Sequence, residues 1–412
     1  MERLHNKSYL MLENVDCMLK IEEKRKCCGC SACAQICTRN CITMQADAEG
    51  FLYPVIDESR CVNCGLCEKA CPVLNVKSDK TDCTPQTYAV YSKDENVRLE
   101  SSSGGTFSLL AEYVLASGGV VFGAVMTEDC RSVKHILVES ADNLRNLRGS
   151  KYLQSEIGLT YIKAREFLND GREVLYSGTP CQIEGLKAFL GKDYENLTCV
   201  DIICHGVPSP KLWKKYVDYR EKRAGSPARQ TIFRHKKYGW KSYAVLFEYS
   251  NNTAYEQIHS KDLFMQMFLQ NICLRPSCYF CEFKKKNRIS DITLADFWGC
   301  QRVCPEMDDN KGLSAVMIHS DKGRALFDAI RSGAEVKQVD VSQIAAGNPS
   351  LMQSCALPSK RDEFMSHIDD FSIDKLAKKY LKKTSVKVRI INKVASIVPR
   401  EVKQAVKRMI RR

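Results

Sequence analysis

Apolar and polar positions follow two different patterns along the chain, and the change comes near residue 85. Beyond this point, short apolar runs alternate with stretches in which apolar residues recur at helical spacing. The short runs predict strands at 87–92, 119–126, 173–178, 199–204, 290–298 and 313–320. The longer stretches predict helices at 106–117, 179–190 and 261–274, and a turn at 321–323 leads into another helix. This repeated order predicts an α/β body domain with a sheet of mixed strand direction.

Two cysteine runs precede the body and share the spacing C-x2-C-x2-C-x3-C. The stretch between them predicts a strand pair with a turn at Glu49-Gly50. In two-cluster ferredoxins, three thiolates of each run bind one 4Fe-4S cluster and the fourth reaches the other cluster. One predicted cluster is therefore assigned to Cys27, Cys30, Cys33 and Cys71. The second is assigned to Cys37, Cys61, Cys64 and Cys67.

These runs predict an N-terminal α+β domain of the bacterial ferredoxin type. Pro72 follows the second run, whereas Thr38 stands at the corresponding place after the first. Proline there shapes the turn and binds no iron, so we expect altered local geometry with the same ligands. Zinc knuckles are the alternative, but zinc sites use four ligands, often as two distant CxxC pairs. Cys28 and Cys41 lie off the ligand spacing and are predicted to be packed thiols.

The composition indicates the redox compartment in which we expect to find the protein. The chain has 22 cysteines among 412 residues. No uncharged apolar run reaches the roughly 18 residues that a membrane-spanning helix needs. The first residues mix charges among apolar positions and lack a signal-peptide core. We therefore expect a cytoplasmic protein, in which thiols stay reduced and abundant cysteines indicate metal rather than disulfides.

The net charge of +13 belongs to the C-terminal end. Residues 375–412 hold 14 Lys and Arg and one acid, Glu401, whereas the remainder holds 48 basic and 48 acidic residues. A nucleic-acid-binding fold would carry its basic residues on the body, so we predict no nucleic-acid partner. The end segment predicts two basic amphipathic helices separated at Pro399. Such helices are typical of peripheral contact with an anionic membrane; a partner protein and a solvated tail are the alternatives.

Two loops of the body are candidate phosphate sites. Ser101–Thr106 is rich in serine and glycine and leads directly into the helix predicted at 106–117. Backbone N–H groups and hydroxyls at a helix N-terminus bind phosphate, such as the diphosphate of a nucleotide cofactor. A helix cap with a flexible lead-in would look the same. Arg148–Tyr152 offers a cation and small residues, which could hold a phosphate or cap a turn.

Four further cysteines are candidates for a third 4Fe-4S cluster. Cys181 and Cys204 each lie at the carboxyl end of a predicted strand, the edge where ligands gather in α/β sheets. Cys278 and Cys281 form a CxxC pair after the helix predicted at 261–274. Together they supply four thiolates, the number that such a cluster takes. The alternative is that Cys181 and Cys204 are ordinary buried cysteines and that the CxxC pair is coincidental.

A series of motifs resembles the coenzyme F420 hydrogenase/dehydrogenase beta subunit family. In chain order they are SSGGTFSLLAEYVL, VVFGA, RGSKYLQSEIG, GTPCQIEGLKAFL, DIICHGVPSPKLW, SCYFC and SDITLADFWG. The resemblance covers residues 27 to about 330, including the fused ferredoxin module. Members reduce the deazaflavin coenzyme or other substrates, including chlorophyll intermediates, so the resemblance does not fix the substrate.

The resemblance implies FAD and an iron–sulfur cluster in the body. It supports a ligand set of Cys181, Cys204, Cys278 and Cys281. It also implies flavin contacts from Ser102, Ser103, Gly104, Gly105, Thr106, Ser150 and Lys151. Cys300 and Cys304 depart from the family pattern after DFWG, as spare thiols or as competitors of the CxxC pair.

The chain is thus predicted to comprise a leader (1–24), a ferredoxin-like domain (25–80), a body in two parts (85–165 and 166–345) and a basic helical tail (346–412). The first part of the body carries the flavin phosphate loop, and the second carries the third cluster and the flavin site. We expect an oxidoreductase that takes electrons from ferredoxin or a partner subunit through the clusters to FAD and a small-molecule substrate. The alternatives are a non-catalytic electron-transfer subunit and a scaffold whose clusters only support the fold.

Overall fold

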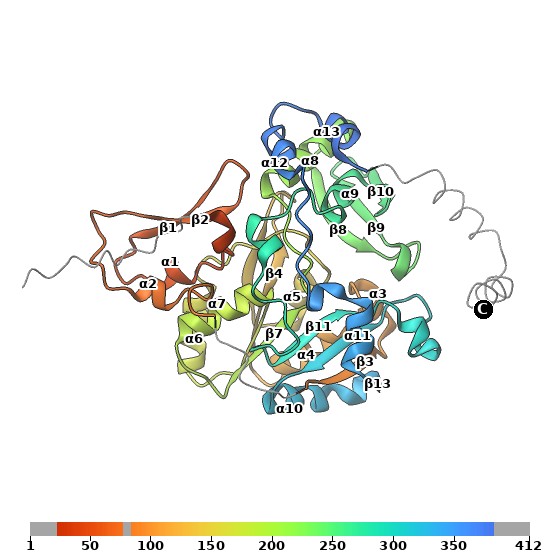
Figure 1. Cartoon of the computed structure of the whole chain (residues 1–412). Helices are drawn as coiled ribbons and strands as arrows, with labels where there is room; N and C mark the ends of the chain where they lie inside the picture. The colour runs from red at the N-terminus through yellow and green to blue at the C-terminus, as the bar shows by residue number, and fades with distance from the viewer. Residues whose placement is uncertain (1–22, 77–83, 383–412) are drawn as a thin grey trace, which may run out of the picture.

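The computed structural model describes residues 23–76 and 84–382. These form an N-terminal module (23–76), a sheet of eight strands with helices on both faces, and a smaller sheet of three strands (Figure 1). No helix formed by the described residues is both long and apolar enough to cross a bilayer. Most of the predicted leader and the tail beyond residue 382 lie outside the described residues.

The large sheet has the strand order β13-β3-β12-β11-β7-β6-β4-β5. Its strands, in that order, are Ala334–Val339, Gln86–Ser92, Ser314–Ile318, Ile292–Asp296, Leu197–Ile202, Val174–Gly178, Val120–Met126 and Val133–Val138. The central strands β11, β7, β6 and β4 pair in parallel, and the pairs toward both edges are antiparallel. The predicted α/β fold with a mixed sheet is therefore confirmed.

Helices cover both faces of this sheet. Within β6, Val174 and Tyr176 pack toward one face, whereas Leu175 packs toward the other, as the alternation of a strand requires. The first face is covered by α6 (Thr160–Asn169) and α7 (Pro180–Leu190). The second is covered by helices that include α4 (Thr106–Ala116), α5 (Ala141–Leu144) and α10 (Asp321–Ile330). Burial on both faces explains why the central strands read as nearly continuous apolar runs.

The N-terminal module consists of α1 (Ala32–Ile36), the strands β1 (Ile42–Ala46) and β2 (Leu52–Ile56), and α2 (Leu66–Lys69). The two strands form the predicted antiparallel pair, and Gly50 adopts a left-handed conformation (φ 86°) in the turn between them. This turn lies against the body: a Cβ at Gly50 would come within 2.7 Å of the Lys211 backbone nitrogen. The hairpin therefore requires glycine at the point where it docks.

The three-stranded antiparallel sheet, with order β10-β9-β8, was not predicted from the sequence. Its strands, in that order, are Ala254–Ile258, Ala244–Tyr249 and Ala228–His235. It shares an aromatic core with α8 (Pro210–Ala224) and α9 (Leu263–Leu269), which include Trp213 and Phe264. The helix predicted at 261–274 is shorter in the structure, where α9 begins directly after its N-cap residue, Asp262.

The last described helices, α12 (Arg361–Ser366) and α13 (Ile373–Tyr380), pack on the same core. Ile373, Leu376 and Tyr380 are buried there. The segment predicted as tail from residue 346 thus begins with packed structure. The predicted amphipathic helices separated at Pro399 lie outside the described residues.

The turn predicted at 321–323 is wrong. Asp321 begins α10, and the hydroxyl of Ser320 accepts a hydrogen bond from the Gly323 backbone N–H (3.1 Å). Ser320 is thus the N-cap of the helix, and the Asp-Lys-Gly sequence forms its first turn.

Candidate functional site

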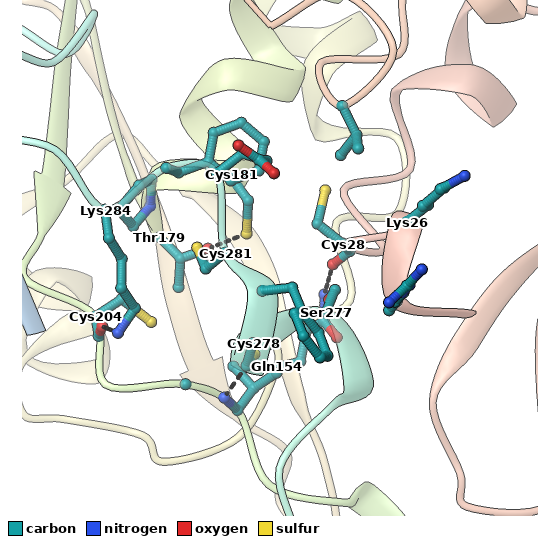
Figure 2. A pocket seen from close by; sticks show the side chains of 18 of the residues that line it. Lys26, Cys28, Gln154, Thr179, Cys181, Cys204, Ser277, Cys278, Cys281 and Lys284 are labelled. Atoms are coloured by element: carbon teal, nitrogen blue, oxygen red, sulfur yellow. Dashed lines mark hydrogen bonds between the residues drawn. The ribbon is translucent and has the colours of Figure 1, made fainter. Parts of the chain in front are cut away.

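Four cysteines from three separate segments line one cavity of about 290 Å³, which we call the thiol cavity. They are Cys181, Cys204, Cys278 and Cys281, the four that were predicted to act together. Figure 2 shows them around the cavity, with Cys28 of the N-terminal module on another side. Strand order explains the first two: β6 and β7 are parallel neighbours, so their carboxyl ends meet at one edge of the sheet.

Local structure fixes Cys181 in the first turn of α7. Thr179 caps this helix, Pro180 occupies its first position, and the Thr179 N–H donates to the Gln182 side chain (2.9 Å). Cys278 and Cys281 lie in and directly after a short 3-10 helix, η4 (Pro276–Phe280). The capped helix and the short turn hold three of the four sulfurs on rigid elements.

The four sulfurs lie in a poorly solvated region that contains basic side chains. Burial raises the pKa of the Cys204 thiol to about 12, and it also raises the pKa of Cys278 and Cys281. The Val207 N–H donates to the Cys278 sulfur (3.5 Å), and Lys284 donates to the Cys204 carbonyl (2.9 Å). Without a metal these thiols stay protonated, whereas metal binding would release their protons.

Arg288 also lines the thiol cavity and has one unsatisfied donor. Its Nη1 donates to the Asp201 carboxylate and to the Ile202 carbonyl (both 3.0 Å), whereas its buried Nη2 has no partner among the described residues. Buried donors are rarely left unpaired, so this atom indicates an electron-rich group in the cavity. Four thiols and one free cationic N–H fit a 4Fe-4S cluster, whose sulfurs accept such hydrogen bonds.

The described residues do not form a binding site for a single metal ion. Within residues 23–76 and 84–382, no three His, Cys, Asp or Glu side chains converge as ligands of one metal ion do. A cluster of four irons takes one cysteine per iron and has its ligands farther apart.

Eight of the ten cysteines of the N-terminal module are the predicted ligands of two clusters. Cys33 lies close to Cys27, Cys71 and Cys67, and burial together with these neighbouring thiols raises its pKa to about 12. The sulfur of Cys37 lies 3.3 Å from that of Cys41. Cys27, Cys30 and Cys33 are buried, whereas Cys64 is exposed. The division of these cysteines into two ligand sets stays a prediction.

A second, larger cavity of about 690 Å³ adjoins the thiol cavity. Both are lined by Thr179, Cys204, Gly206 and Val207. Of the seven predicted flavin contacts, six line the large cavity: Ser102, Ser103, Gly105, Thr106, Ser150 and Lys151. Gly104 is buried behind the loop, where a Cβ would come within 2.2 Å of the Val90 carbonyl oxygen.

The two predicted phosphate loops meet on one wall of this cavity. The backbone N–H and the hydroxyl of Ser150 both contact the Ser102 hydroxyl (2.5 and 2.8 Å). Lys151 donates to three carbonyls, those of Asn146, Leu147 and Arg148, at 2.8–3.0 Å. Burial lowers the pKa of Lys151 to about 7. The Lys151 side chain is thus used to hold the loop in shape. The prediction of a phosphate site rests on the backbone N–H groups of the serine- and glycine-rich loop.

Within the part of the chain that the structure describes, three buried polar atoms on the large cavity have no hydrogen-bond partner: Thr106 Oγ1, His135 Nδ1 and Arg234 Nε. The other nitrogen of His135 lies 2.8 Å from the Ser177 carbonyl, which requires the proton on Nε2 and leaves Nδ1 as an acceptor. The guanidinium of Arg234 is held by the Asp296 carboxylate (2.8 Å). Unpaired donors and acceptors beside aromatic side chains fit a large polar cofactor such as a flavin.

Comparison with known sequences matches both halves of the body to one family, described as the coenzyme F420 hydrogenase/dehydrogenase beta subunit. The N-terminal domain of that family matches residues 87–159, and its C-terminal domain matches residues 171–343. The chain belongs to this family. A 4Fe-4S dicluster domain matches residues 26–75, so the chain has a fused ferredoxin-type module, as predicted from the sequence.

Curated relatives match parts of this chain. A coenzyme F420-dependent sulfite reductase of Methanocaldococcus jannaschii is 26% identical over 171 residues, which cover 41% of this chain and 26% of the relative. An NADH-quinone oxidoreductase subunit I of Pelobacter propionicus is 35% identical over 69 residues, which cover 15% of this chain and 37% of the relative. The chain thus spans well under half the length of these relatives.

Among solved structures, the F420-reducing [NiFe] hydrogenase complex of Methanosarcina barkeri contains a similar chain. The match covers 71% of the present chain and 89% of the hydrogenase chain, with 15% identity and a TM-score of 0.43.

The sequence did not predict two features of the chain, and it left open the role of Cys300 and Cys304. Cys28 was predicted to be a packed thiol, and it is buried, but it also lines the thiol cavity. His135 and Arg234 lie on β5 and β8, two strands that the sequence did not predict. Cys300 and Cys304 are fully buried in a separate core with Phe297 and Met307, so they do not compete for the thiol cavity.

Proposed function

We propose that this protein is an iron–sulfur flavoprotein oxidoreductase. In this proposal the N-terminal module holds two 4Fe-4S clusters, the thiol cavity holds a third, and the large cavity holds FAD. The observation that carries it is the common wall of the two cavities, where Cys204 and Val207 face both. A cluster passes single electrons and a flavin exchanges one or two, so adjacent sites suit conversion between the two modes.

Each part of the chain has a distinct role in this proposal. The exposed end of the module, near Cys64, would receive electrons from ferredoxin or a partner subunit. The sulfurs of the thiol cavity and the Arg288 guanidinium would hold the third cluster, and the Ser102–Thr106 loop would bind the diphosphate of FAD. The substrate, a small molecule, would then be reduced in the large cavity.

The composition of the anaerobically purified chain tests this proposal. We expect about twelve irons, an equal amount of sulfide and one FAD per chain. About eight irons without flavin would leave only the ferredoxin-type module and contradict the proposal for the body.

A non-catalytic electron-transfer subunit is the second candidate. It is favoured by the relatives of the N-terminal module that are themselves named as subunits of a larger oxidoreductase. Turnover of a soluble acceptor by the isolated chain would favour the enzyme; electron transfer only to a partner protein would favour the subunit.

Replacing Thr106 by valine should separate flavin binding from folding. The Oγ1 atom of Thr106 is buried without a partner, so its loss should not lower the free energy of unfolding of the flavin-free chain. The same change should weaken FAD binding about tenfold, because the hydroxyl is then missing from the site. A fluorescence titration of flavin-free protein measures this affinity.

Thr160→Val is the matched control. Thr160 Oγ1 bonds to the Ile157 carbonyl (2.8 Å) and the Tyr176 hydroxyl (2.7 Å), away from the large cavity. This variant should lose about 1–2 kcal/mol of stability and keep its FAD affinity. Equal FAD affinities in wild type and Thr106→Val would contradict the assignment of the loop.

The basic tail is proposed to hold the protein at the cytoplasmic face of an anionic membrane. Because α13 packs on the body to Tyr380, a deletion should begin after Lys382. The chain without residues 383–412 should lose binding to anionic liposomes and keep its irons, since the cysteines lie elsewhere. Cosedimentation measures this, and undiminished binding would rule out the tail as the anchor.

A further inference from the structure

Cys28 lies between two cysteine sites that the chain keeps apart in sequence. It directly follows Cys27, whose backbone is extended (φ −118°, ψ 115°), so the two side chains point to opposite sides. Cys27 packs with Phe51 in one core, whereas Cys28 packs with Ile183 of α7 in another. Cys28 thereby reaches the thiol cavity while its neighbour stays with the module.

The Cys28 side chain packs in one cluster with a predicted ligand from each site. That cluster includes Cys30 on the module side and Cys181 on the thiol cavity side, and Cys28 lines the cavity together with Cys181. Gly185 of α7 allows this close packing, because a Cβ there would come within 2.9 Å of the Cys30 sulfur. The three cysteines therefore lead from the module to the cavity.

The backbone around Cys28 is fixed from the body side. Gln154 donates to the Cys28 carbonyl (2.8 Å), and Arg275 donates to the Cys27 carbonyl (2.9 Å). Gly29 follows in a left-handed conformation (φ 70°), and a Cβ there would come within 2.8 Å of the Arg275 guanidinium. The thiol is thus held in place and is only 8% exposed.

We propose that Cys28 is the contact through which electrons pass between the Cys27/Cys30/Cys33/Cys71 site and the thiol cavity. This inference rests on the proposed function, in which both sites hold clusters. Each site has four thiols for four irons, so Cys28 is a fifth thiol and serves as a positioning residue. One electron leaves the reduced module site and one arrives at the oxidised site, while Cys28 keeps its proton and forms no bond.

One physical effect supports this role. A polarizable sulfur fills the gap between Cys30 and Cys181, and electron transfer is faster across packed atoms than across an empty gap. This packing favours transfer between the module and the thiol cavity.

The test compares Cys28→Ala and Cys28→Ser with Cys41→Ser in the full-length, anaerobically purified protein. Cys41 is the matched control, since it is the other cysteine of the module outside the ligand spacing and its sulfur lies beside Cys37. Each variant is mixed with one equivalent of reduced ferredoxin and frozen at successive times for EPR. Iron content and the midpoint potential of the third cluster are measured on the same samples.

We expect all variants to keep about twelve irons. In Cys28→Ala, transfer from the module to the third cluster should slow at least about tenfold, whereas the potential of that cluster should stay the same. Cys28→Ser should lie between, and Cys41→Ser should match wild type. An unchanged rate in Cys28→Ala would overturn the inference, as would loss of about four irons, which would make Cys28 a ligand. Wild-type protein with only about eight irons would overturn the proposed function itself and the inference with it.

Discussion

Replacing Cys278 by serine is expected to lower the iron content of the purified chain from about twelve to about eight atoms. The variant should bind FAD but no longer reduce it with electrons from a protein donor. Cys278 lines the thiol cavity, but it is absent from the wall of the large cavity, so its loss removes the third cluster and spares the flavin site. Iron analysis and flavin bleaching under reduced ferredoxin measure the two results.

Cys300→Ser provides the control for this experiment. Cys300 is as deeply buried as any described cysteine, but it packs with Phe297 and Met307 and does not line the thiol cavity. It should keep all irons and the rate of flavin reduction. A Cys278→Ser protein with a full complement of iron would contradict the third cluster at this position.

Replacing Arg275 by methionine is expected to cost about 3 kcal/mol of unfolding free energy. Arg275 is fully buried, and its guanidinium donates to the carbonyls of Cys27 and Leu52 (both 2.9 Å) and to the Gln154 side chain (3.1 Å). Methionine fills the space but leaves these acceptors of the N-terminal module unpaired, and unpaired buried groups are costly. Urea unfolding of the anaerobic protein measures the loss.

An exposed arginine of α8 serves for comparison. Arg223 pairs with Asp374 (3.1 Å), and both side chains are more than half exposed. Arg223→Met should change the unfolding free energy by less than about 1 kcal/mol, because solvent screens such pairs. Equal stability of the two variants would mean that Arg275 does not anchor the module.

Local chemistry was readable from the sequence because it depends on short spacing. The two cysteine runs, the strand–helix order around Cys181 and the glycine-rich loop before α4 each lie within a dozen or so residues. The structure confirms the strand–helix order and the helix that follows the loop. The three-stranded sheet was missed because strands such as β10, with sequence AYEQI and no buried residue, lack a clear apolar alternation. The turn at 321–323 was mispredicted because a serine cap outweighs the local preference of Asp-Lys-Gly.

The sequence did not predict which residues far apart in the chain lie close together in the fold. Nothing in the sequence pattern around Cys28 indicates that its side chain packs in one cluster with Cys181, because that packing depends on how α7 lies against the module. The same holds for Arg234 and His135, whose unpaired atoms reach the large cavity only because separate strands bring them there. The tertiary fold determines these positions, and single-sequence patterns carry no record of them.

The bond between Arg275 and the Cys27 carbonyl joins residues that are 248 positions apart. During synthesis, the N-terminal module emerges from the ribosome long before residue 275. The face of the module that packs on Arg275 therefore stays uncovered until that residue has been made. Three residues after Arg275 comes Cys278, so the same late segment both covers the module and completes the thiol cavity. We therefore expect a fixed order of maturation, in which iron enters the module first and the interior site can be filled only as the chain closes over it.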